Sequence, residues 1–154
     1  MAAYFLDSSA LVKRYASETG TSWIFSLVRP AASNRLYLAR ITGVEVVSAL
    51  TRRERGGRLS PTATAKAVAR FERELFNKYV AVEISPALIL VAMRLAKTHA
   101  LRGYDAVQLA AALEVHQLRA SAGATPLKLV SADDALNAAA VAEGLTVDNP
   151  NHHP

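Results

Sequence analysis

The residues from Gly103 to Arg119, GYDAVQLAAALEVHQLR, decide the fold. Apolar side chains occupy nearly every face of the helix that this stretch predicts, so we expect the helix at the centre of the molecule. On its carboxyl side, Leu127–Val130 has the length and composition of a buried strand. A buried helix followed by a buried strand indicates a core in which helices pack against a sheet.

The same alternation of strand-like and helical segments extends over the whole chain, which predicts an α/β fold with a mainly parallel sheet. Ser60-Pro61 and Ser85-Pro86 are typical helix starts, and Thr42 with Glu45 predicts a capping box. Ser8 or Ser9 is expected to cap the first helix. The expected strands are 4–6, 36–39, 79–84, 127–130 and 145–147, and the expected helices are 8–15, a second helix opening at 23–28, 42–55, 61–78, 86–98, 103–119 and 134–143.

Length and composition fit one domain, which we place at residues 1–148 and follow with a short, disordered polar tail at 149–154. The chain has no Cys, which excludes disulfides and thiolate metal sites. No apolar run approaches the ~20 residues of a membrane span. The start of the chain lacks the features of a signal peptide. We therefore expect a soluble, cytoplasmic protein.

The charge is unevenly distributed. The net charge is +5, and residues 1–77 carry 12 Lys or Arg against 6 Asp or Glu. A basic half indicates an acidic partner, with nucleic acid the leading candidate, although the same charges also serve solubility.

Four acidic residues stand where an α/β fold builds its site. Asp7 and Asp133 follow expected strands, and Glu45 and Asp105 lie in the first turns of expected helices. Ligands of open α/β sheets bind beyond the carboxyl ends of the strands, so the four are expected to meet in one crevice. Carboxylates at close range repel one another unless a cation joins them. Oxygen-only ligands suit Mg²⁺, or Mn²⁺ in its place, and no pair of His has the i,i+4 spacing of a zinc site.

Each acid also has a purely structural interpretation. Asp7 is a possible helix N-cap, Glu45 belongs to the expected capping box, and Asp105 complements a helix dipole. Either Asp133 or Asp134 is expected to cap the helix that follows. The functional hypothesis rests on the four acids together.

Two of these acids lie in motifs with a family resemblance. LDSSALVKRY, residues 6–15, resembles the opening motif of PIN domains, specifically of VapC-type toxins, and LRGYDAVQLAAA, residues 101–112, closely resembles the third acidic motif of that family. The segments 43–50 and 130–145 resemble its second motif and closing region more loosely.

The resemblance implies a PIN-like three-layer α/β/α sandwich and a Mg²⁺-dependent endoribonuclease, the toxin of a type II toxin–antitoxin system. It also implies a homodimer and a VapB-type antitoxin that blocks the active site. Carried over residue by residue, Asp7 and Asp105 match the principal metal ligands and Glu45 the third acid, while the fourth falls on Asp133 rather than Asp134. Two Mg²⁺ ions held by acids of this kind can activate a water for attack on a phosphodiester.

Candidates for contacts to the RNA come from the same motifs and from a basic run. Ser9 is expected to hydrogen-bond Asp7 or a phosphate, or to cap its own helix. Lys13, Arg14 and Arg102 lie close to the acidic motifs in sequence. A run of Arg at 52, 53, 55 and 58 indicates either a phosphate-binding edge or a solvated helix end.

Two alternatives remain open. A phosphoacceptor signalling module also gathers acids at strand ends around Mg²⁺, but such modules usually have an acidic pair after the first strand, where this chain has Ser8-Ser9 after Asp7. A catalytically silent RNA-binding or antitoxin-binding protein on the same fold is the second alternative.

Overall fold

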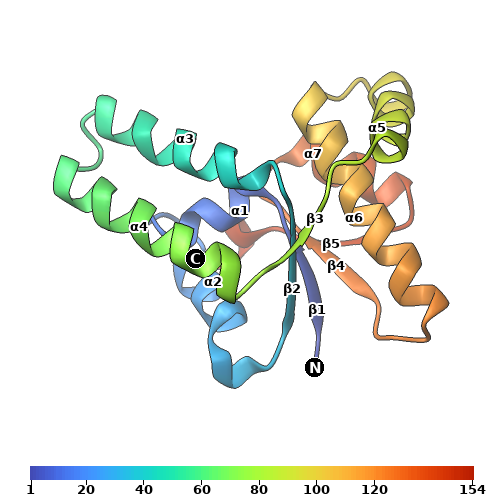
Figure 1. The fold of residues 1–154 in the computed structure, drawn as a ribbon, viewed down its shortest axis with the longest axis horizontal. Coiled ribbons are helices and arrows are strands. Elements are labelled where there is room, and N and C mark those ends of the chain that lie inside the picture. The colour runs from blue at the N-terminus through green and yellow to red at the C-terminus, as the bar shows by residue number, and fades with distance from the viewer.

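A five-stranded sheet, all of whose neighbouring strands are parallel, runs through the middle of the molecule (Figure 1). The computed structural model describes all 154 residues. The strand order is β3-β2-β1-β4-β5, so the first strand lies at the centre. The strands are β1 (Ala3–Leu6), β2 (Arg35–Ala39), β3 (Val80–Val82), β4 (Leu127–Val130) and β5 (Thr146–Asp148). The predicted parallel α/β architecture is confirmed.

Helices cover both faces of this sheet and form the outer two layers of an α/β/α sandwich (Figure 1). The first four helices in the chain cover one face, and the last three cover the other. Three short 3-10 turns connect or extend these elements. The helices are α1 (Ser8–Leu11), α2 (Thr21–Val28), α3 (Thr42–Arg55), α4 (Pro61–Asn77), α5 (Pro86–His99), α6 (Gly103–Ser121) and α7 (Asp134–Ala142), and the 3-10 turns are η1 (Val12–Arg14), η2 (Pro30–Ala32) and η3 (Pro150–His152).

The strands divide their side chains between two hydrophobic cores, because successive residues of a strand point to opposite faces. Phe5 and Leu129 pack in the core under α5, α6 and α7, whereas Leu6 and Val130 pack in the core under the first four helices. Because the side chains alternate between the two faces, a shift of one residue would exchange the two sets of side chains. Burial therefore fixes the register of the sheet.

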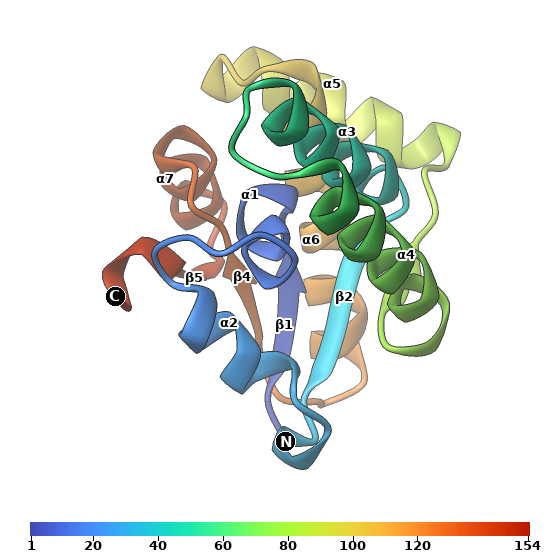
Figure 2. The same cartoon turned by 90° about the vertical axis from the view of Figure 1, so that its left-hand side faces the viewer.

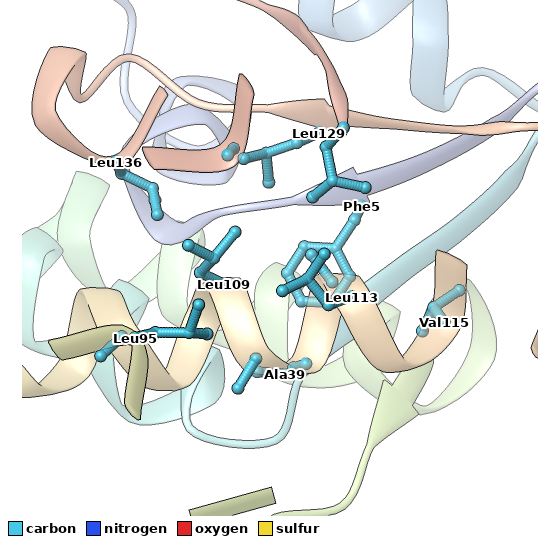
Figure 3. Close-up of a cluster of buried hydrophobic side chains, with 14 of the residues drawn as sticks. Phe5, Ala39, Leu95, Leu109, Leu113, Val115, Leu129 and Leu136 are labelled. Carbon is cyan, nitrogen blue, oxygen red and sulfur yellow. The ribbon is translucent and has the colours of Figure 1, made fainter. Parts of the chain in front are cut away.

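Helix α6 is the central helix that its sequence predicts. Its residues Leu109 and Leu113 face the sheet beside Phe5 and Leu129, as Figure 3 shows. Leu95 of α5 belongs to the same core cluster and lies near Leu109 in this view. Each fully buried large apolar side chain contributes about 1.5–3 kcal/mol to folding, so this helix is a main source of stability.

Serine caps start two of the helices as predicted. The hydroxyls of Ser60 and Ser85 accept hydrogen bonds from the backbone N–H groups three residues later, each at 3.1 Å. Of the caps considered for the first helix, the structure has Asp7, while Ser8 and Ser9 lie inside α1. The expected continuous helix over 8–15 is wrong, because α1 passes into the 3-10 turn η1 at Val12.

The carboxyl-terminal residues are packed against the domain, so the prediction of a disordered tail is wrong. They form η3 beside α2 (Figure 2). The ring of His153 stacks on Trp23 with 4.1 Å between ring centroids, and its Nε2 lies 2.8 Å from Asp148 Oδ1. A Cβ atom on Gly20, which has a φ of +87°, would lie only 2.2 Å from the Pro150 carbonyl oxygen. A tight backbone contact therefore holds this tail, and polarity alone did not indicate it.

The register of β1 determines where the two segments that follow the central strands lie. Leu6 pairs with Val130 at the end of β4, and the backbone N–H of Asp7 donates to the Val130 carbonyl at 3.0 Å. The first residues after β1 and after β4 therefore lie side by side at the carboxyl edge of the sheet.

None of the helices combines the length and apolar character that a membrane-spanning helix requires.

Candidate active site

One cavity of about 590 Å³ opens at the carboxyl edge of the sheet. The segments after β1 and β4 border it together with the first turns of α3 and α6. All four acids singled out in the sequence line this cavity, namely Asp7, Glu45, Asp105 and Asp133. The structure thus brings together residues that lie up to 126 positions apart in the chain.

Asp7 is the most buried of the four acids, with 2% of its surface exposed. Its Oδ2 atom accepts hydrogen bonds from the N–H of Ser9 at 3.1 Å, from the Ser9 hydroxyl at 2.5 Å and from the Ser131 hydroxyl at 3.4 Å. Burial raises the pKa of Asp7 to about 6 against the lowering effect of the Ser9 hydrogen bonds, and the charge of Glu45 adds to the rise. The hydrogen bonds all end on Oδ2, which leaves Oδ1 free for a ligand.

Glu45 is held by two neutral side chains from other helices. Its Oε2 accepts from the Ser8 hydroxyl at 2.5 Å, and its Oε1 accepts from Gln108 Nε2 at 3.0 Å. The predicted capping box is wrong, because α3 begins at Thr42 and its N-cap residue Ile41 makes no side-chain cap. Thr42 instead accepts from Gln108 Nε2 at 2.8 Å. Glu45 therefore points toward the cavity and not back along its own helix.

Asp105 and Asp133 share a guanidinium group. Arg102 donates from Nε to Asp105 Oδ2 at 3.3 Å and from Nη2 to Asp133 Oδ2 at 3.2 Å. The pKa of Asp105 is raised by burial and by the charges of Asp133 and Asp7, although Arg102 opposes the rise. The side chain of Arg102 is 68% exposed, so its displacement would uncover little buried surface. A positive charge thus already lies between two of the four acids.

Asp133 also caps a helix, as one of the two neighbouring acids was expected to do. Its Oδ1 accepts from the backbone N–H of Leu136 at 2.9 Å, which starts α7. Asp134 is exposed and does not border the cavity. The structure therefore favours Asp133 over Asp134 as the fourth acid of the site.

The donor set suits a divalent cation in its chemistry. The cavity offers carboxylate and hydroxyl oxygens and neither sulfur nor imidazole, which is the ligand set that Mg²⁺ and Mn²⁺ prefer. In this arrangement no three of the acids lie close enough together to share one ion. Asp105 and Asp133 are turned toward Arg102, so a cation has to compete with this guanidinium group. The residues fit a hard divalent cation, provided that Arg102 is displaced.

Three cationic side chains line the same cavity and are here called the cationic wall, namely those of Lys13, which is buried, and of Arg52 and Arg53. Glu18 accepts from Lys13 Nζ at 3.3 Å through Oε2 and from Arg53 Nε at 2.8 Å through Oε1. Although burial acts to raise it, the pKa of Glu18 is lowered by Arg53 and Lys13. Arg52 also borders the cavity, and its Nη1 donates to Ser48 Oγ at 2.8 Å without an acidic partner. Glu18 thus pairs with two of the three cations, and the wall keeps a net positive charge.

Arg14 does not belong to this wall. It is buried outside the cavity and donates to both carboxylate oxygens of Glu74, each at 2.8 Å. The Tyr15 hydroxyl donates to the same carboxylate at 2.7 Å. The pKa of Glu74 falls to about 2 although burial opposes the shift, because Arg14 and Tyr15 bind its ionised form. We therefore remove Arg14 from the candidates for RNA contacts and assign it to the core.

Several residues of the site were missed in the sequence. Ser131 follows β4 as Asp7 follows β1, so the rule that identified Asp7 could have identified it. Gln108 is a polar residue on an otherwise apolar helix, three positions after Asp105, and that break in the pattern was a usable signal. Nothing local in the sequence indicated Glu18, because its role depends on how the loop before α2 packs against α3.

Comparison with known proteins decides the family. The sequence profile of the PIN domain matches residues 4–142. The chain belongs to the PIN domain family. PIN domains are generally nucleases, and they typically use divalent metal ions. A search of curated proteins gives no significant match.

Solved structures share the PIN fold over nearly the whole chain. PAE2754 from Pyrobaculum aerophilum is 22% identical with a TM-score of 0.60, over 95% of this chain and 89% of that one. FitAcB from Neisseria gonorrhoeae is 17% identical with a TM-score of 0.66, over 97% and 99%. VapBC2 from Rickettsia felis, bound to a DNA fragment from its promoter, is 12% identical with a TM-score of 0.60, over 96% and 98%. At these identities the likeness shows the fold.

The buried charge of Asp7 makes a measurable prediction about stability. Its pKa of about 6 in the folded protein exceeds the ordinary value of 3.8, so proton uptake stabilises the fold as pH falls from 6 toward 4, and this stabilisation is lost as pH rises through 6. A shift of about two units corresponds to about 3 kcal/mol. We expect Asp7→Asn to be more stable than wild type by up to about 3 kcal/mol at pH 8 in EDTA, and by little at pH 4.

Urea unfolding at both pH values measures this difference. Asp134→Asn is the matched control, because it removes the charge of an exposed acid outside the cavity. A stability difference between Asp7→Asn and wild type that is the same at pH 4 and pH 8 would contradict the prediction.

Proposed function

We propose that this chain is a Mg²⁺-dependent endoribonuclease of the VapC type, the toxin of a type II toxin–antitoxin system. The observation that carries the proposal is the cavity itself, which these four acids and the three cations of the wall line together. Acids that bind a metal and cations that bind phosphate are the two halves of a phosphodiester-cleaving site. The family assignment supports a nuclease, and the choice of RNA and of Mg²⁺ is our proposal.

The acids divide into two pairs. Asp7 and Asp105 are proposed to hold the first Mg²⁺, with Glu45 and Asp133 completing the ligation directly or through water. When bound there, Mg²⁺ or Mn²⁺ would offset part of the negative charge of these carboxylates and would lower the pKa of a bound water. Ser9 and Ser131 hold Asp7 Oδ2, which keeps the Oδ1 atom available.

Lys13, Arg52 and Arg53 are proposed to receive the phosphates of the RNA. If Asp105 and Asp133 held a cation in place of Arg102, the guanidinium group of Arg102 would be free to contact the substrate. The wall then holds the scissile phosphate in line for attack by water. The new bond forms between the water oxygen and phosphorus, and the bond from phosphorus to the 3′ oxygen breaks. The 3′ oxygen takes up a proton, so the products carry a 5′ phosphate and a 3′ hydroxyl.

The proposed partners follow from the family resemblance. FitAcB and VapBC2 have this fold, and the name VapBC2 joins the Vap B and C components that the resemblance implies. We propose a VapB-type antitoxin that blocks the cavity, and a homodimer of this chain. The catalytically silent RNA-binding or antitoxin-binding alternative uses the same fold, and only an activity measurement separates it from the nuclease. The phosphoacceptor alternative gains no support from the family match.

Cleavage of total cellular RNA by the purified, antitoxin-free protein tests the activity. We expect discrete fragments with 5′ phosphates in Mg²⁺ and none in EDTA. Asp7→Ala and Asp105→Asn should each lower the rate at least about 100-fold, because each removes a proposed metal ligand. Asp134→Asn, which alters an acid outside the cavity, should keep the wild-type rate. Intact RNA with the folded wild type would favour the silent alternative, and full activity of Asp7→Ala would refute the proposed site.

The cationic wall makes a separate prediction about RNA affinity. In EDTA, where no cleavage occurs, Arg53→Gln should weaken the binding of single-stranded RNA and reduce the slope of log affinity against log salt by about 1, since one phosphate contact is lost. Glu18→Gln should strengthen binding, because it removes the carboxylate that neutralises Lys13 and Arg53.

Fluorescence anisotropy at several salt concentrations measures both effects. Arg55→Gln is the control, since Arg55 lies on the same helix but is exposed outside the cavity. Equal effects of Arg53→Gln and Arg55→Gln would show that the cavity wall has no special role in binding.

A further inference from the structure

We infer that Gln108, together with Ser8, is a positioning residue that fixes the carboxylate of Glu45 in the cavity. This inference rests on the proposed function and assigns a role to two residues that touch neither the metal nor the substrate in that scheme. The supporting observation is a pair of hydrogen bonds, one to each oxygen of Glu45. The Ser8 hydroxyl binds Oε2 at 2.5 Å and Gln108 Nε2 binds Oε1 at 3.0 Å.

Gln108 is unusual in its burial. None of its surface is exposed, and it lies on α6 among alanine and leucine side chains of the core. An apolar residue would fill such a position at less cost, because a buried amide needs partners for all its polar atoms. Its amide nitrogen has two acceptors, Glu45 Oε1 and Thr42 Oγ1 at 2.8 Å, but its Oε1 is buried without a hydrogen-bond partner. The amide is therefore satisfied only on the side that faces Glu45 and Thr42.

The orientation of this amide follows from the charge of Glu45. The reversed amide would place the Gln108 oxygen against a carboxylate oxygen, and two acceptors at hydrogen-bond distance repel each other. The observed orientation instead leaves one carbonyl unpaired and gives both amide protons to α3.

The position of Gln108 also connects two proposed ligands. It follows Asp105 by three residues, so the two side chains project from the same face of α6, one turn apart. Through Gln108, the helix that supplies Asp105 also orients Glu45 on α3. Ser8 directly follows Asp7 in the chain, so its hydrogen bond connects Glu45 to the segment that carries Asp7. Glu45 is therefore oriented by the elements that carry the two principal acids, which fixes its direction before any metal binds.

Residues that orient metal ligands typically change metal affinity by 10–100-fold when they are replaced. We expect Gln108→Met, which keeps the length and removes the donor, to weaken Mn²⁺ binding on the order of 10-fold. Ser8→Ala should weaken it in the same direction, and it remains informative if Gln108→Met does not fold. Isothermal titration of Mn²⁺ into the metal-free protein measures both without any activity assay.

His116→Leu is the matched control. His116 lies on the same helix and its Nδ1 is also buried without a partner, but it does not border the cavity. Its replacement should leave Mn²⁺ affinity unchanged. His116→Leu removes a buried polar atom of α6 but leaves the contact with Glu45 intact. Comparing it with Gln108→Met therefore isolates the effect of that contact.

A double-mutant cycle with Glu45→Ala separates positioning from general damage to the fold. If Gln108 acts through Glu45, Gln108→Met weakens Mn²⁺ binding in the wild type and has no further effect in Glu45→Ala. Equal losses in both backgrounds would overturn the inference, and so would a loss for Glu45→Ala with none for Gln108→Met and Ser8→Ala. Those outcomes leave the proposed function standing. A wild-type protein that binds no Mn²⁺ would overturn the proposed function and this inference together.

Discussion

The parallel pairing of β1 with β4 is the constraint on which the site depends. This pairing places Asp7 beside the end of β4, where its backbone N–H binds the Val130 carbonyl. A carboxylate that follows directly after a central strand is enclosed by α1 and by the segment after β4. Its burial, the two serines that bind Oδ2 and the free Oδ1 all result from that location. The hydrophobic register that stabilises the fold therefore also positions the first acid.

A cluster of carboxylates at one sheet edge opposes folding unless positive charge offsets it, because burial and mutual repulsion both raise their pKa values. In this chain the four carboxylates have two kinds of partner. Arg102 bridges Asp105 and Asp133 from an exposed position, while Asp7 and Glu45 receive neutral hydrogen-bond donors. Only the first arrangement involves a cation, and that cation is exposed to solvent. In our account Arg102 substitutes for the metal in its absence and is released toward the RNA when the metal binds.

The sequence predicted the architecture because periodicity reports burial directly. The all-round apolar pattern of α6 and the Ser-Pro starts of α4 and α5 are local signals, and each is confirmed. The motifs around Asp7 and Asp105 also carried the family. Side-chain partners were harder to predict. Thr42 and Glu45 satisfy a local capping pattern, yet both bind Gln108, 66 and 63 positions away. Arg14 resembled a phosphate contact and pairs with Glu74, because tertiary packing decides which cations remain accessible.

The same limit applies at the carboxyl end, where a short polar segment indicated disorder. Its order depends on the stacking of His153 on Trp23 and on the close approach of Pro150 to Gly20, and neither contact has a signature in the tail itself. Glu18 belongs to the same class. It acts in the cavity only because the loop that carries it packs against Arg53 of α3. Long-range pairing of this kind requires the three-dimensional arrangement.

Anomalous X-ray diffraction from crystals soaked in Mn²⁺ tests the central claim most directly. The account predicts an anomalous peak in the cavity within coordination distance of Asp7 Oδ1, with Asp105 turned toward the ion and Arg102 withdrawn from Asp105 and Asp133. Such a peak would identify the acids as a metal site and Arg102 as the group that the metal displaces. No peak in the cavity at saturating Mn²⁺, with Arg102 still bridging the two acids, would contradict the account.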